Sequence, residues 1–205
     1  MPTVFLLAPA PEVPPGEPVE LRCLLKVSEP VVSVSSSRLR VTRAGGEVVT
    51  EIDDAFGLPR EPVTGPTRLE RHENVWPPAP GAYLATWIVD EVSEQAAFGV
   101  LDAPAGSRPA ELRLLAVPGD LEPQLAFQYR SAAEHDLAAA LLGSTLVVDG
   151  VAHEHRGATW DGWATLPAGE WTWGWLALED YGITGPVERG RVELRYGGLV
   201  AGAEL

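Results

Sequence analysis

Three groups of side chains in this sequence have types and spacings that could support binding or chemistry. The first is His153 and His155, which share one face of a predicted strand as an H-x-H pair that could ligate zinc or copper. A metal site needs a third and a fourth ligand, and no further H-x-H and no C-x-x-C occurs. We therefore predict no metal site and no cofactor.

The second group is acidic. Glu51, Asp53 and Asp54 open a long segment without its own periodicity, and carboxylates at this density could hold calcium. The spacing and the closing glutamate of an EF-hand are missing. A solvated acidic loop is the better interpretation of these three residues.

The third group is Trp171, Trp173 and Trp175, which alternate along a strand and so share one face. Such a row could form a platform that stacks sugar rings, or it could belong to a tryptophan-rich core. The base rates of aromatic burial favour the core.

The sequence contains no recognisable catalytic constellation. It has no G-x-S-x-G elbow and no glycine-rich phosphate loop, and its four histidines offer few general bases. Many carboxylate pairs exist, but no spacing singles out one of them for glycoside hydrolysis. We predict that the protein is not an enzyme.

Composition limits the partners and the compartment. The 205 residues carry a net charge of −14, so no basic face is available to bind nucleic acid. No apolar run reaches the ~20 residues that span a bilayer, and the N-terminus lacks the basic region of a signal peptide. The one cysteine, Cys23, excludes an intrachain disulfide. These features predict a protein of the cytoplasm or of a virion, with no membrane partner.

Short β-type runs alternate with proline- and glycine-rich turns, which is typical of sandwiches and barrels. One stretch differs: Ser131 and Glu134 form a capping-box pattern, so a short helix is expected near 132–142. The predicted strands are Thr3–Leu7, Pro18–Val27, Val31–Thr42, Glu47–Ile52, Arg68–Glu73, Ala82–Asp90, Gln95–Leu101, Ala110–Val117, Gln124–Arg130, Ser144–Asp149, Val151–Arg156, Thr159–Thr165, Glu170–Leu178 and Gly190–Tyr196.

An aromatic pattern occurs twice and indicates two copies of one structural unit. Residues 76–87 read WPPAPGAYLATW and residues 163–175 read WATLPAGEWTWGW. We predict domains at 1–102 and 110–205, joined by a small polar linker at 103–109.

The first copy is longer than the second, and the extra residues contain a loop at 52–67. Long loops are commonly binding elements. The candidate partner-binding residues in this loop are Asp53, Asp54, Phe56, Leu58 and Arg60.

The first copy resembles an immunoglobulin-like domain. Its residues Gly81–Ala85 follow the G-x-Y-x-C pattern of such domains, with Ala85 in place of the cysteine, while Cys23 stands where the partner cysteine would be. The resemblance implies an all-β protein of two tandem immunoglobulin-like antiparallel β-sandwiches without the cross-sheet disulfide. In the second copy it places Trp171 and Trp173 at inward positions, which supports the core interpretation.

Bacterial and phage modules of this kind are usually adhesive or structural, so the resemblance implies a structural or interaction protein. Lysine occurs once, at Lys26, and arginine supplies the other basic residues, as expected from a high-GC genome. Our first expectation is a virion component, a capsid decoration or tail protein, of a phage of a high-GC host.

Two alternatives remain: a cytoplasmic protein-binding module or inhibitor, and a carbohydrate-binding module. A protein partner or self-assembly is expected in the first two cases. We expect the 52–67 loop and the chain end, Gly197–Leu205, to make the principal intermolecular contacts.

Overall fold

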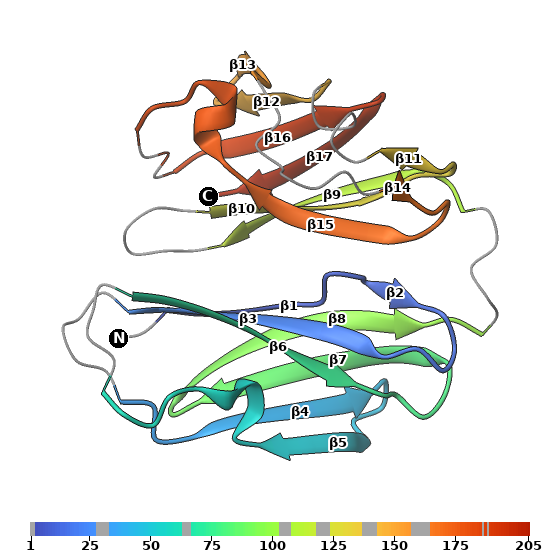
Figure 1. Ribbon diagram of the computed structural model, residues 1–205, viewed down its shortest axis with the longest axis vertical. Helices are drawn as coiled ribbons and strands as arrows, with labels where there is room; N and C mark the ends of the chain where they lie inside the picture. Colours follow the sequence, from blue (N-terminus) through green and yellow to red (C-terminus); the bar gives the residue numbers. More distant parts are fainter. Residues whose placement is uncertain are drawn as a thin grey trace. The chain divides into compact units, whose positions relative to one another are not determined.

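The computed structural model describes residues 3–27, 33–62, 67–102, 108–117, 124–136, 143–156, 165–185, 187 and 189–205. The chain divides into two compact units, Met1–Ala105 and Gly106–Leu205. The described residues form mostly antiparallel sheets that do not close into a barrel, so the chain is all-β as predicted (Figure 1). None of their helical segments has the length and apolar character needed to cross a bilayer.

The first unit is a sandwich of two sheets. One sheet has the order β1-β3-β6 and the other the order β2-β8-β7-β4-β5, in which only β2 and β8 pair in parallel. The strands are β1 (Thr3–Leu7), β2 (Glu12–Val13), β3 (Val19–Val27), β4 (Ser37–Arg43), β5 (Val48–Asp53), β6 (Thr67–Val75), β7 (Gly81–Val89) and β8 (Val92–Val100). A 3-10 turn, η1 (Ala55–Gly57), follows β5.

The core of this unit is filled by side chains that alternate along the strands with more exposed ones. Along β7, Tyr83, Ala85, Trp87 and Val89 are buried while the residues between them are partly exposed. Cys23 is buried on β3 of the facing sheet and belongs to the same apolar cluster. The period of two that defined these strands in the sequence therefore also defines the inner faces of the two sheets.

The turn into β7 is fixed by a hydrogen bond. The hydroxyl group of Tyr83 donates to the carbonyl oxygen of Ala79 at 2.5 Å, and its ring stacks on Phe98 with centroids 5.4 Å apart. Gly81 has φ of 143°, a conformation that a side chain would strain. The proline-rich segment before β7 is thus fixed to the strand by this hydrogen bond.

The second unit repeats this arrangement. One sheet has the order β15-β10-β9, a second has the order β13-β12-β16-β17, and β11 pairs with β14. The strands are β9 (Glu111–Val117), β10 (Gln124–Arg130), β11 (His135–Asp136), β12 (Thr145–Val148), β13 (Val151–Glu154), β14 (Thr165–Leu166), β15 (Trp171–Leu176), β16 (Arg191–Tyr196) and β17 (Leu199–Glu204). A 3-10 turn, η2 (Leu178–Tyr181), follows β15.

Sheet order shows which strands of the two units correspond. The order β1-β3-β6 matches β9-β10-β15, and β8-β7-β4-β5 matches β17-β16-β12-β13. The counterpart of β7 is therefore β16, whereas the sequence pattern had aligned β7 with β15. The alignment of the two aromatic patterns is wrong by one strand. A turn followed by alternating aromatic residues is found at both β7 and β15, although these strands do not correspond.

The expected helix near 132–142 is wrong where the structure describes that stretch. Ser131 accepts the backbone N–H of Ala133 with its hydroxyl group, at 3.2 Å, which forms a local turn instead of a helix cap. His135 and Asp136 then pair with β14. Residues 137–142 lie outside the described part, as do 159–164 of a predicted strand, 63–66 of the long loop and 103–107 of the linker.

The chain end forms a strand that the sequence analysis did not predict. Residues Leu199–Glu204 are β17, which pairs with β16 along its whole length through a turn at Gly197 and Gly198. Gly197 and Gly198 have φ of 55° and 82°, which suits a two-residue hairpin turn. The end of the chain is therefore part of the sheet of its own unit.

Candidate functional site

The segment after β5 has an uncommon backbone. Asp54 and Phe56 adopt left-handed conformations, with φ of 55° and 66°. Such a conformation is unfavourable for a residue with a side chain, especially a bulky aromatic one, and persists only where its surroundings fix it. This segment is therefore held in place by the contacts around it.

Those contacts join the segment to the core. The ring of Phe56 is buried and meets the ring of Trp87 edge-on, with centroids 5.1 Å apart. The hydroxyl group of Ser37 donates to the carbonyl oxygen of Ala55 at 2.8 Å and accepts from Nε1 of Trp87 at 3.0 Å. The backbone N–H of Phe56 donates to Oε2 of Glu73 at 3.2 Å. The loop is thus anchored to β4, β6 and β7.

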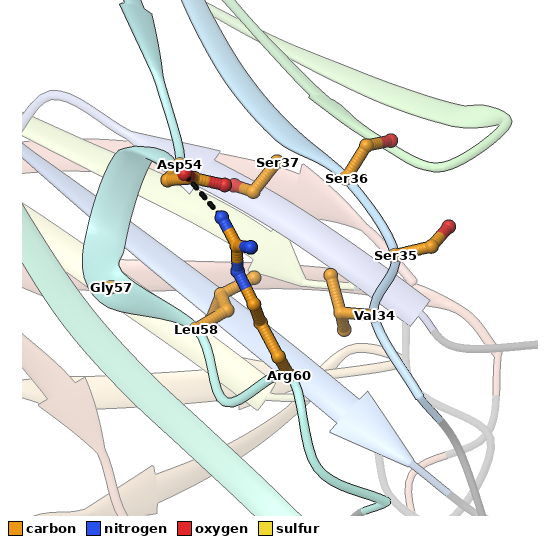
Figure 2. Close-up of a pocket in the computed structure, with 8 residues that line it drawn as sticks. All are labelled: Val34, Ser35, Ser36, Ser37, Asp54, Gly57, Leu58 and Arg60. Atoms are coloured by element: carbon orange, nitrogen blue, oxygen red, sulfur yellow. Dashed lines mark hydrogen bonds and ion pairs between the residues drawn. The ribbon is translucent and has the colours of Figure 1, made fainter.

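A pocket of about 220 Å³ lies beside this anchored segment on the first unit. Two short segments form its walls, one before β4 and one after β5, as Figure 2 shows. The lining residues are Val34, Ser35, Ser36, Ser37, Asp54, Gly57, Leu58 and Arg60. The side chains of Arg60 and Asp54, which both belong to the segment after β5, form an ion pair at the pocket with Nη2 and Oδ2 2.5 Å apart, and both are exposed.

A second carboxylate lies behind the serine wall. Oδ1 of Asp90 accepts hydrogen bonds from the hydroxyl group of Ser35 at 2.6 Å and from the backbone N–H groups of Ser35 and Ser36 at 3.0 and 2.8 Å. These bonds, led by the Ser35 hydroxyl, lower the pKa of Asp90. The donors are neutral, so they leave the negative charge of Asp90 uncompensated.

The two acidic residues of β5 that lead into the loop are paired with arginines. Nε of Arg38 lies 2.8 Å from Oδ1 of Asp53, and Nε of Arg40 lies 2.8 Å from Oε2 of Glu51. The described residues contain no group of three or more histidine, cysteine, aspartate or glutamate side chains arranged to hold a metal ion. The acidic start of the loop is a series of ion pairs.

The five predicted partner-binding residues have different positions. Asp54, Leu58 and Arg60 line the pocket, whereas Phe56 is buried against Trp87 and Asp53 is exposed, and neither is part of the lining. The serine wall was not predicted, because the run at 35–37 was assigned to a long β-strand. The clustering of three serines before a strand was the only available indication of a polar wall.

The tryptophan row lies on the outer face of its sheet, so the core interpretation is wrong. On β15 the core-facing residues are Gly174 and Leu176, and Leu176 belongs to the apolar cluster of the second unit. The tryptophans alternate with these residues, and each is only partly buried. The inward register failed because it relied on matching β15 with β7.

The rings of this row are not parallel. Trp173 and Trp175 meet edge-on at an interplanar angle of 75°, with centroids 5.6 Å apart. The guanidinium groups of Arg113 and Arg130 lie 4.9 and 4.7 Å from the ring centroid of Trp171. The row is an arginine–tryptophan cluster rather than a flat platform.

His153 and His155 have different neighbours. His153 lies in β13 opposite Leu146, while His155 lies after the strand with its ring edge-on to Tyr181 at 5.0 Å. Tyr181 in turn shares a buried hydrogen bond of 2.8 Å with Ser144. His155 thus packs beside a buried polar pair.

Comparison with known proteins gives no family. No family model matches the chain, and no curated protein matches it. Among solved structures, the chain is similar to a crystal structure of a mutant Salmonella alpha-2-macroglobulin, with a TM-score of 0.37 and 17% sequence identity over 100% of this chain. The chain spans 14% of the length of that protein.

Proposed function

We propose that this chain is a non-enzymatic interaction protein, and that the pocket beside η1 is where the first unit binds a protein partner. The observation that carries the proposal is the fixed left-handed backbone at Asp54 and Phe56. Strained backbone that is anchored by the core and presents an exposed pocket is typical of binding loops on rigid scaffolds. A loop ordered before binding loses less conformational entropy when a partner docks.

Two features support an immunoglobulin-like origin for the scaffold. Both units have sheets in the order expected for strands A-B-E on one side and G-F-C-C′ on the other. The hydrogen bond from Tyr83 to Ala79 has the form of the tyrosine corner of such domains. Scaffolds of this kind carry binding loops at the ends of their strands. The pocket loop likewise begins where β5 ends.

The test is capture of partners from a lysate of the source organism, with the full chain as bait. Leu58→Arg fills the pocket with a bulky cationic side chain, and we expect it to abolish capture of a partner that the wild type retains. Val200→Arg is the matched control, because Val200 is 60% exposed on β17. Equal capture by the wild type and Leu58→Arg, with both folded, would refute the pocket as the binding site.

The virion component expected from the sequence is a more specific form of the same proposal. In that case the partner is a capsid or tail protein, and electron microscopy of particles from the source should show density for both units on their surface. A pool of free monomer with no particle-bound fraction would count against the virion setting and leave the cytoplasmic binding module.

A further inference from the structure

The pocket beside η1 already contains a basic side chain of this protein. In Figure 2 the aliphatic part of Arg60 runs between Leu58 and Val34, and its guanidinium group reaches Asp54. The site thus provides apolar contacts for the stem of an arginine and a carboxylate for its head. Arginine uses both kinds of contact when it binds in a half-open site.

Arg60 is held loosely in this position. The side chains of Arg60 and Asp54 are 74% and 64% exposed, and solvent-exposed ion pairs of this kind contribute little to stability. Both residues belong to the same short loop, so Arg60 can turn outward without moving the anchored backbone. An incoming side chain could therefore replace it.

The charge of the pocket also favours a cation. When Arg60 turns outward, the carboxylate of Asp54 remains at the pocket, whose lining, among the residues that the structure describes, contains no other carboxylate and no other basic side chain. The chain as a whole carries a net charge of −14, which attracts basic partners over longer distances. An anionic side chain would face the carboxylate of Asp54 and be repelled.

We propose that this pocket receives an arginine side chain of the protein partner, which displaces Arg60 from Asp54. The inference rests on the proposed function and identifies the chemistry that the partner must present. Arg60 is then an internal competitor, which occupies the pocket until the guanidinium group of the partner's arginine replaces it at Asp54. Asp54 is the residue that recognises the charge, and Val34 and Leu58 contact the stem.

Two single substitutions should change binding in opposite directions. Asp54→Asn removes the recognising charge but suits the left-handed backbone, because asparagine tolerates that conformation well. Arg60→Ala removes the competitor together with its positive charge. Arg195→Ala is the matched control, since Arg195 is an exposed arginine of β16 in the second unit, paired with Glu193.

The measurement is a titration of the full chain with N-acetyl-argininamide, followed through amide chemical shifts in NMR spectra. We expect saturable shifts at residues 34–37 and 54–60, about fivefold weaker binding in Asp54→Asn and severalfold tighter binding in Arg60→Ala. Arg195→Ala should bind as the wild type does. N-acetyl-glutaminamide, which has a similar shape without the charge, should give no saturable shifts there.

The proposal is overturned if the glutamine probe shifts the same amides as strongly, or if Arg60→Ala binds the arginine probe more weakly than the wild type. Unchanged amide spectra elsewhere in each variant show that the fold is intact. Partner capture separates this result from the proposed function. If Leu58→Arg abolishes capture while Asp54→Asn does not affect it, the binding site stands and the arginine inference fails.

Discussion

Burial of the Cys23 thiol should make the first unit lose stability at alkaline pH. Cys23 is 1% exposed between the two sheets, and this burial raises the pKa of its thiol from 9.0 to about 12. Because the folded pKa is the higher one, the stabilising contribution is complete below pH 9 and is lost as the pH rises toward 12. The unfolded chain ionises in this interval while the folded chain stays protonated.

The size of the effect follows from the same values. The interval from 9.0 to about 12, at about 1.4 kcal/mol for each pH unit, gives a total loss of about 4 kcal/mol. At pH 11 the loss should be about 2.5 kcal/mol, since only part of the interval has been crossed. That is a large share of the 5–15 kcal/mol that stabilises a typical domain.

The assay is urea unfolding at pH 8, 9.5 and 11, monitored by tryptophan fluorescence, for the wild type and Cys23→Ala. The transition that the substitution shifts at pH 8 identifies the first unit. Burial also raises the pKa values of Tyr181 and Tyr196, but both proteins retain these tyrosines, so their contribution cancels in the comparison. Parallel pH dependence in the wild type and Cys23→Ala would refute the reasoning.

Three further predictions concern the parts that hold the pocket and the corner of the first unit. Tyr83→Phe should lower the free energy of unfolding by about 1 kcal/mol, because the hydrogen bond to Ala79 is lost; urea unfolding measures it, with no change contradicting the role of the corner. Phe56→Ala should cost about 3 kcal/mol and speed amide hydrogen exchange in the pocket loop, because the ring buried against Trp87 is removed; unchanged exchange would show that the ring does not anchor the loop. The lowered pKa of Asp90 means that its stabilising contribution is present above pH 3.8 and is lost as the pH falls further, so Asp90→Asn should flatten acid unfolding of the first unit; equal acid sensitivity in both proteins would contradict this.

Strands were predictable here where turn residues flank a run of β-prone side chains. The bounds of β1 and β10 agree with the sequence prediction, because turn residues flank each run. Which strand pairs with which was less predictable. A turn followed by alternating aromatic residues occurs at both β7 and β15, and only their pairing partners distinguish an inner strand from an outer one.

The pocket was predictable in part. The length and composition of the loop indicated Asp54, Leu58 and Arg60, because loops without periodicity commonly carry binding residues. The serine wall could not be found in this way, since residues 34–37 come beside the loop through the pairing of β4 with β5 and the hydrogen bond from Ser37 to Ala55. Nor does sequence predict a phenylalanine with φ of 66°, because that conformation is set by the contact of its ring with Trp87.

The arginine–tryptophan cluster of the second unit has a different character from the pocket. Trp171 lies opposite Arg130 on β10, and Arg130 lies opposite Glu111 on β9. Glu111 binds both arginines that contact the ring, Arg113 and Arg130, with N–O distances of 2.8 Å. A sugar ring would have to displace a guanidinium group that is held on two sides before it could stack on Trp171. Cation–π contacts linked to ion pairs across three strands instead stabilise the sheet. This row therefore stabilises the sheet, whereas Arg60 is held by an exposed ion pair alone, which is why we propose the pocket of the first unit as the binding site.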